Sequence, residues 1–372
     1  MKNEQISEFL ESRIEANDFP SAVYLVAERG EIVFEDALGL AIAEPIRVEA
    51  KLATIYDLAS LTKVLVTGLL CTKLVETGAV NLPDKIAKYF SEFDIDEKRE
   101  ITIKNLLTHT SGFVNWKPFY LITNDKLRIT NVIACEPLAN PVGSTVVYSD
   151  LNFIIVGLLL EKIHGKPLDE IAKNEIFEPL QLRDTFFTPP RSRREEFAAA
   201  EFGNYHEKNT CIELGYDVSK HDWRDYQICG EVHDGNCWFM DGVSGHAGIF
   251  STAEETFRIA QQFLAEESVL LRPETCALFR TNFTPGLNEA RSIAFQLAET
   301  KDSTASLALS KDSFGHLGFT GTSLWIEPES GRIFILLTNR IHAHKLPFVL
   351  INSVRRRFHE LAQEGLSSES RF

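Results

Sequence analysis

Ser60 and Lys63 form the first pair of residues in the sequence that could carry out covalent chemistry. They stand in the segment 57–63, where a long apolar stretch with helical spacing begins. Residues three apart lie on one face of a helix, so the lysine amine can reach the serine hydroxyl. A serine becomes an effective nucleophile when a neighbouring base takes its proton. We expect partial burial in a cleft to lower the pKa of Lys63 enough for that role.

Two further groups of polar residues flank strongly apolar segments. Tyr148, Asp150 and Asn152 come directly before and at the start of a buried helical pattern. His316 and Gly318 come before the last strand-like pair, where a glycine lets a ligand approach a strand edge. A serine and a lysine at this spacing are weak evidence alone, but three polar motifs in order favour an enzyme active site.

Together these residues resemble the serine β-lactamase superfamily, which includes class C β-lactamases, DD-peptidases and family VIII esterases. The family's three motifs are S-x-x-K, Y-x-N and K-T-G or H-x-G. They match, in the same order, Ser60–Lys63, Tyr148–Asp150 and His316–Gly318. Supporting matches lie at residues 106–112 and 245–252, so that the resemblance extends from about residue 20 to residue 345.

A second H-x-G occurs at residues 246–248 and competes for the third motif. It is followed by a helix cap, whereas His316 is followed by the strand-rich hairpin that the motif requires. We therefore assign the third motif to His316, and we interpret His246, His233 and His109 as structural residues.

The resemblance implies a role for each matching residue. Ser60 would attack an acyl carbon, and Lys63 and Tyr148 would carry the proton to the leaving group. The backbone N–H groups of Ser60 and Phe319 would stabilise the oxyanion, where one such donor typically contributes about 2.7–4 kcal/mol. The substrate-binding residues would be Asp150, Asn152, His316, Gly318 and Phe319, and the chemistry requires no metal or organic cofactor.

Two positions depart from the β-lactamase pattern. Asp150 replaces an asparagine, so an acceptor stands where the family has an amide donor, unless Asn152 compensates. His316 replaces the lysine that helps to hold the antibiotic carboxylate, and it is mostly neutral at pH 7. We expect protonation of His316 near pH 6, and replacement of His316 by lysine, to strengthen any acylation by β-lactams.

These departures favour a serine hydrolase that acts through an acyl-enzyme on a small ester, amide or peptide. Residues 230–251 are similar to a subgroup associated with cell-wall peptide or amide turnover. Two alternatives stay open: a β-lactamase or DD-peptidase, and a covalent receptor for β-lactams or peptides that is acylated but does not turn over.

Strand-like and helix-like patterns predict an α+β fold. Two apolar, β-rich runs surround Arg29-Gly30, and two more surround residues 328–331, with helix-like segments at 1–18 and 345–361. One antiparallel sheet built from both ends of the chain accounts for this symmetry. We predict a sheet domain at 1–60 plus 236–372, a mainly helical domain at 61–235, and an active site between them.

Several capped helices are predicted in the middle of the chain. Their expected ranges are 61–76 with Gly78 as its C-cap, 102–108 with Thr102 as its N-cap, 151–164, and 253–264 after a capping box at 251–255. The stretch 188–235, rich in charge, glycine and proline, is predicted to be loop.

Composition restricts the partners and the compartment. Asp and Glu outnumber Lys and Arg by 53 to 38, a net charge of −15 that opposes binding to nucleic acids or anionic membranes. Neither a secretory signal nor a membrane-spanning run is recognisable, which predicts a cytoplasmic protein. The six cysteines contain no C-x-x-C pair and are expected to be free thiols. A zinc-organised module at Cys229, His233, Cys237 and His246 is the least favoured alternative.

Overall fold

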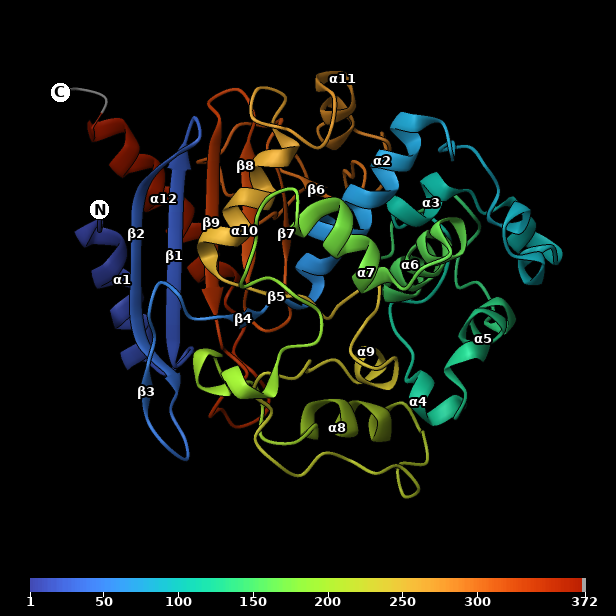
Figure 1. The fold of residues 1–372 in the computed structure, drawn as a ribbon, viewed down its shortest axis with the longest axis horizontal. Coiled ribbons are helices and arrows are strands. Elements are labelled where there is room, and N and C mark those ends of the chain that lie inside the picture. The colour runs from blue at the N-terminus through green and yellow to red at the C-terminus, as the bar shows by residue number, and fades with distance from the viewer. Residues whose placement is uncertain (370–372) are drawn as a thin grey trace.

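A seven-stranded antiparallel sheet organises the molecule, which we describe from a computed structural model that covers residues 1–369 (Figure 1). The strand order is β3-β2-β1-β9-β8-β7-β6, and a separate two-stranded sheet pairs β4 with β5. The strands are β1 Ser21–Glu28, β2 Glu31–Ile42, β3 Val48–Glu49, β4 Tyr56–Asp57, β5 Phe250–Ser251, β6 Gln296–Leu297, β7 Phe314–Leu317, β8 Ser323–Glu327 and β9 Arg332–Thr338.

The first and last long strands lie next to each other at the centre of this sheet. β1 pairs with β2 on one side and with β9 on the other, from Ala22 opposite Thr338 to Glu28 opposite Arg332. The prediction of one antiparallel sheet built from both ends of the chain is therefore confirmed. The division into domains at residues 60, 61, 235 and 236 stays a prediction.

Twelve α-helices surround the sheet within residues 1–369. They are α1 Glu4–Glu15, α2 Leu69–Thr77, α3 Ile103–Leu107, α4 Phe119–Ile122, α5 Ile129–Cys135, α6 Asp150–His164, α7 Leu168–Ala172, α8 Tyr205–Glu213, α9 Gly235–Phe239, α10 Ala253–Ala260, α11 Pro273–Cys276 and α12 Asn352–Glu369. Within this range no helix combines the length and the apolar character that crossing a membrane demands.

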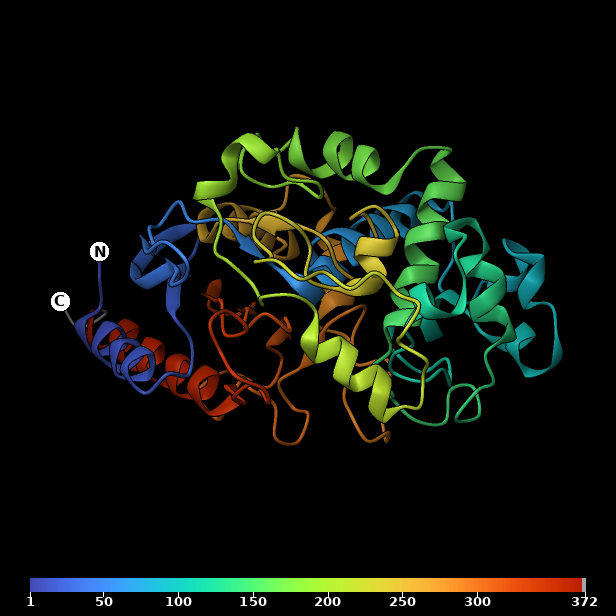
Figure 2. The same cartoon turned by 90° about the horizontal axis from the view of Figure 1, so that it is seen from below.

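Helices cover both faces of the sheet. The side chains of a strand alternate between the two faces, so the apolar side chains on each face are buried under helices. Along β1, Val23 and Leu25 belong to the large core shared with the helical part, whereas Tyr24 and Val26 belong to a smaller core under α1 and α12. Figure 2 shows α1 and α12 side by side at one edge of the molecule, and the two helices are in contact. Helix α10 packs on the opposite face, against β1 and β9.

Most predicted helices are present, with shifted ends. The 61–76 helix consists of a 3-10 turn at Ala59–Leu61, a π-helical segment at Lys63–Gly68 and α2, and it ends at Gly78 in the left-handed conformation with φ of 76°. Thr102 caps α3 as predicted. The predicted helix at 253–264 ends earlier as an α-helix, at Ala260, and continues as a 3-10 turn at Gln261–Phe263.

Two predictions are wrong in part. The stretch 188–235 is not all loop, because it contains α8, whose Cys211 and Glu207 are buried. The sequence of α8 is mostly polar, because only one narrow side of the helix is buried. It therefore lacks the repeated apolar residues from which a helix is predicted. The C-terminal helix begins at Asn352 rather than Lys345, because Leu346-Pro347 interrupts the chain before it.

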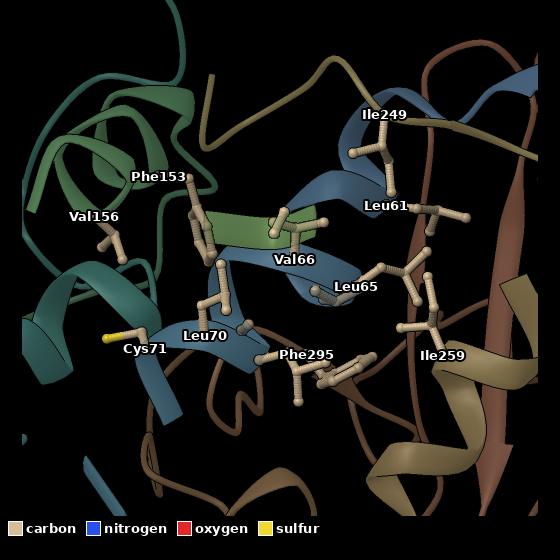
Figure 3. Packing of buried hydrophobic residues seen from close by; sticks show 14 of the residues in the cluster. Leu61, Leu65, Val66, Leu70, Cys71, Phe153, Val156, Ile249, Ile259 and Phe295 are labelled. Atoms are coloured by element: carbon tan, nitrogen blue, oxygen red, sulfur yellow. The ribbon is translucent and has the colours of Figure 1, made fainter. Parts of the chain in front are cut away.

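The segment that carries Ser60 and Lys63 is surrounded by apolar side chains. Leu61, Leu65 and Val66 pack against three side chains from other segments (Figure 3). These are Phe153 of α6, Ile249 directly before β5, and Ile259 of α10. All six side chains are fully buried. A close-packed environment of this kind allows little movement, so the backbone that presents Ser60 is held rigidly.

Candidate active site

The turn that presents Ser60 is fixed from several directions. Ala59, directly before it, has a positive φ of 47°, an unfavourable conformation for a residue with a side chain. The Asp57 carboxylate accepts a hydrogen bond of 2.8 Å from the Ala59 N–H, which supports that conformation. Thr320 and Thr322 donate to the carbonyls of Asp57 and Leu58 at 2.7 and 3.1 Å. The strand that ends in the third motif is thereby tied to the serine turn.

Lys63 is fully buried and uses its amine for three interactions. Its Nζ lies 2.9 Å from Ser60 Oγ, 2.8 Å from the carbonyl oxygen of His246 and 2.7 Å from Oδ1 of Asp150. A protonated lysine has three N–H bonds and no acceptor, so this arrangement matches an ammonium group. The π-helical segment at Lys63–Gly68 is a feature that occurs often at functional sites.

The expected lowering of the pKa of Lys63 is wrong. Burial lowers this pKa, but the charge of Asp150, together with Tyr148, outweighs burial and leaves the pKa above the ordinary value of 10.5. The burial of Lys63 could be expected from the sequence, but its pairing with Asp150 could not. Lys63 is therefore held as a cation beside the serine.

Tyr148 lies against the same lysine. The Lys63 Nζ is 5.1 Å from the centre of the Tyr148 ring. Burial, and to a lesser extent the charge of Asp150, raise the pKa of Tyr148 above its ordinary value of 10, although the charge of Lys63 and hydrogen bonds to Lys63 and Ser60 oppose that rise. Ser60, Lys63 and Tyr148 are thus brought together, as the motif spacing predicted.

Two residues of the cavity lining, Ser60 and Phe319, have backbone N–H groups without a hydrogen-bond partner in the described chain. Within residues 1–369, neither Ser60 N nor Phe319 N donates a backbone or side-chain hydrogen bond. Gly318 allows the close approach of the two segments, because a Cβ at that position would lie 2.7 Å from the carbonyl oxygen of Leu58. These N–H groups are free to bind a developing oxyanion.

A cavity of about 620 Å³ opens over these groups. Ser60, Tyr148, Asp150 and Phe319 are the predicted site residues that line it. Lys63 lies directly behind Ser60. The remaining wall is formed by apolar and aromatic side chains, among them Val114, Trp116, Leu214 and Tyr216, and by polar groups, among them Lys117, Glu207 and Asp234.

Asn152 does not take part in this cavity, so its predicted contact with substrate is wrong. Its side chain is completely buried in α6, where Oδ1 accepts a hydrogen bond of 2.6 Å from Ser111 and Nδ2 lies 3.3 Å from His109 Nδ1. Asp150 and Asn152 stand about 200° apart around a helix, so only one of them can face the serine.

His316 is also placed differently from the prediction. It is buried outside the cavity lining, with Nδ1 2.9 Å from the carbonyl oxygen of Leu317. Burial, and then the charges of Arg291 and Lys63, keep the pKa of His316 well below 6.5. The expectation that it becomes protonated near pH 6 is wrong. Gly318 contributes through its backbone approach rather than through the cavity wall.

Asp234 and His246 are site residues that the motifs did not indicate. Asp234 caps α9 and lines the cavity, and its Oδ1 lies 2.9 Å from His246 Nε2. Burial alone would raise the pKa of Asp234, but His246 holds it well below its usual range. The H-x-G at residues 246–248 was a signal for this pair, but His246 was interpreted as structural and Asp234 was given no role.

One group of residues within 1–369 has donor atoms close enough for a metal ion: Asp150, Asp234 and His246, with atoms within 4.8 Å of one another. Asp150 is already paired with the Lys63 ammonium, and His246 with Asp234. The proposed zinc cluster does not assemble: His233 binds Glu201, and Cys237 donates to the Ala247 carbonyl.

Comparisons with known proteins identify the family of the chain. A family model described as Beta-lactamase matches residues 6–351. The chain is 30% identical over 376 residues to N-acetylmuramyl-L-alanine amidase of Bacillus subtilis, a match that covers 92% of this chain and 81% of the amidase. It is 29% identical to a putative D-alanyl-D-alanine carboxypeptidase of Escherichia coli K12, over 87% and 79% of the two chains.

Among solved structures, the chain is similar to EstCE1, described as a hydrolase with promiscuous acyltransferase activity. The TM-score is 0.73 with 18% sequence identity, and the match covers 98% of each chain. At this identity the likeness concerns the fold, and it confirms the predicted α+β architecture.

Proposed function

The chain belongs to the beta-lactamase family, and on that premise we propose that it is a serine hydrolase that cleaves small amides or esters through an acyl-enzyme on Ser60. The observation that carries the proposal is the Ser60–Lys63 contact of 2.9 Å at the floor of a cavity of about 620 Å³. Such a cavity holds a small ligand, and its floor presents a nucleophile with a proton carrier beside it.

In the acylation step, Ser60 Oγ attacks the acyl carbon while Tyr148 accepts the hydroxyl proton in its tyrosinate form, whose population rises with pH because the pKa of Tyr148 is raised. Lys63 is not the base in this scheme, because Asp150 holds it as an ammonium. The N–H groups of Ser60 and Phe319 stabilise the oxyanion. Tyr148 then passes its proton to the leaving amine or alcohol, which departs as the C–N or C–O bond breaks.

Deacylation follows the same route in reverse. Water attacks the acyl-enzyme, Tyr148 accepts a proton from that water, and Ser60 recovers a proton as the acid leaves. Lys63 supplies positive charge beside both Ser60 and Tyr148 throughout.

The charge of the cavity favours substrates without a terminal carboxylate. Asp57, Asp150, Glu207 and Asp234 line it, whereas Lys117, 3.2 Å from Glu136, is the only lysine or arginine that lines it within residues 1–369. Burial raises the pKa of both Asp57 and Glu207, whereas His246 holds the pKa of Asp234 well below its usual range. A carboxypeptidase substrate or a β-lactam would bring a further negative charge, so an amide or ester substrate fits better.

The test compares three substrate classes at equal concentration: a p-nitrophenyl ester with a neutral acyl group, nitrocefin, and a peptide that ends in D-Ala-D-Ala. We expect the ester to be cleaved and the two carboxylate-bearing compounds to react at least tenfold more slowly. Ser60→Ala should abolish cleavage and fluorophosphonate labelling, whereas Ser12→Ala, on the exposed side of α1, should leave both unchanged.

Three outcomes distinguish the alternatives. Preferred release of D-Ala from the peptide would replace the proposal with a carboxypeptidase. Preferred turnover of nitrocefin would replace it with a β-lactamase. One equivalent of labelling without sustained turnover would identify a covalent receptor.

A further inference from the structure

A group of buried polar residues packs against Tyr148 and lies outside the cavity lining. His109, His316 and Arg291 are each at most 4% exposed, and none of them lines the cavity. His109 Nε2, His316 Nε2, and Nε and Nη1 of Arg291 have no hydrogen-bond partner within the described chain. Buried polar atoms without partners are rare and call for a reason.

The guanidinium group of Arg291 lies over the Tyr148 ring. Its guanidinium carbon lies 5.6 Å from the centre of the ring, within the range of a cation–π contact. A single carboxylate balances the guanidinium: Glu289 Oε1 lies 2.6 Å from Arg291 Nη2 and also accepts a hydrogen bond from Gln296. Arg291 is thus a cation held in place next to the aromatic ring of a catalytic candidate.

The loop that carries Arg291 also holds the backbone before Tyr148. Asn288 accepts a hydrogen bond of 2.9 Å from the Val146 N–H and donates one of 3.0 Å to the Val146 carbonyl. The loop itself is closed by the Arg291 N–H, which donates to Thr284 Oγ1 at 2.8 Å. One loop therefore holds both the backbone two residues before Tyr148 and its ring.

His109 and His316, which also contact the Tyr148 ring, add no positive charge next to it. His109 stacks against Tyr148 with ring centres 4.6 Å apart, and His316 lies at 5.7 Å. Burial and the charge of Arg291 keep the pKa of each well below 6.5. The charged groups near Tyr148 are accordingly Lys63, Asp150 and Arg291, and Arg291 is paired with Glu289.

We propose that Arg291 is a positioning residue for the acylation step, which holds the Tyr148 ring toward Ser60 and favours its tyrosinate form. The inference rests on the proposed function. The Lys63 cation is balanced by Asp150 at 2.7 Å. Arg291 supplies a second positive charge from a buried position outside the cavity lining.

The test is the pH dependence of kcat/KM for a neutral p-nitrophenyl ester in wild type, Arg291→Gln, Arg291→Lys and Glu289→Gln. In Arg291→Gln the acid limb should move up by about one pH unit, which gives about a tenfold loss at low pH and recovery above the limb, with little change in KM. Arg291→Lys should restore the limb most of the way. Glu289→Gln should move it in the opposite direction, because the guanidinium loses its balancing charge.

An equal loss at every pH in Arg291→Gln, with a lowered Tm, would show a purely structural role and overturn the inference. If Arg291→Gln does not fold, an unshifted or upward-shifted limb in Glu289→Gln overturns it as well. A wild type that neither cleaves esters nor labels at Ser60 would instead refute the proposed function, so the two failures are distinguishable.

Discussion

Replacing Asp150 by asparagine removes the group that keeps Lys63 charged. Opposite unit charges 2.7 Å apart attract by about 6 kcal/mol at an effective dielectric constant of about 20. Even half of this energy corresponds to about two pKa units. Burial of Lys63 then acts with little opposition, and its pKa in the folded variant should fall below the ordinary value of 10.5.

The sign of the effect on stability follows from this shift. In wild type the pKa of Lys63 is raised, so its contribution is fully present below the unfolded pKa near 10.5 and is lost as pH rises through the folded pKa. In Asp150→Asn the folded pKa lies below the unfolded one. The unfolded chain then binds more protons, and the variant gains stability as pH rises toward 10.5.

The assay is urea unfolding of wild type and Asp150→Asn between pH 6 and pH 10. We expect the difference in unfolding free energy to be largest at pH 6 and to shrink by about 2 kcal/mol by pH 10, for a two-unit shift. Glu170→Gln is the matched control, because Glu170 is also 2.7 Å from a lysine, Lys166, but in a solvent-exposed pair. Its difference should stay below about 1 kcal/mol throughout. An Asp150→Asn difference that is the same at pH 6 and pH 10 would refute the reasoning.

Three further predictions concern the serine, the third motif and the glycine that joins them. Ser60→Ala should lose all fluorophosphonate labelling by intact-mass analysis, and a label at another residue would show that the nucleophile is misassigned. His316→Lys should destabilise the protein by about 3 kcal/mol or more, measured by urea unfolding, because it buries a second cation near Arg291; a gain in β-lactam acylation at unchanged stability would contradict this. Gly318→Ala should lower kcat by about 10²-fold or more, because its Cβ would lie 2.0 Å from a threonine oxygen and displace the Phe319 N–H. Gly78→Ala, whose Cβ meets nothing within 4 Å, should lower Tm by a few degrees but leave kcat unchanged.

Local patterns in the sequence predicted the parts of the fold that depend on local physics. Helical spacing and the caps at Gly78 and Thr102 placed α2 and α3, and the turns at Gly30 and Gly331 placed the two hairpins. The Ser60–Lys63 contact followed from residues three apart on one turn. These features need no knowledge of what lies across the molecule.

Side-chain directions and long-range partners were not predictable in the same way. The Lys63–Asp150 pair joins two helices that are far apart in the sequence, and it reversed the expected shift of the lysine pKa. Arg291 lies in a loop without periodicity, so nothing local indicated that it covers Tyr148. Asn152 is the exception, because the angle between residues 150 and 152 of a helix already placed it away from Ser60.

The pairing of β1 with β9 has a consequence for the newly made chain. The β1–β2 hairpin leaves the ribosome early, but its neighbour at 332–338 is synthesised roughly 300 residues later, after roughly 15 to 60 s at about 5–20 residues per second. Throughout this interval one edge of β1 offers unpaired backbone groups, which are a template for pairing with other chains. The segment that holds Phe319 also arrives late, so no nascent intermediate has a complete oxyanion site. We therefore expect the yield of active protein to depend on protection of the β1 edge during translation.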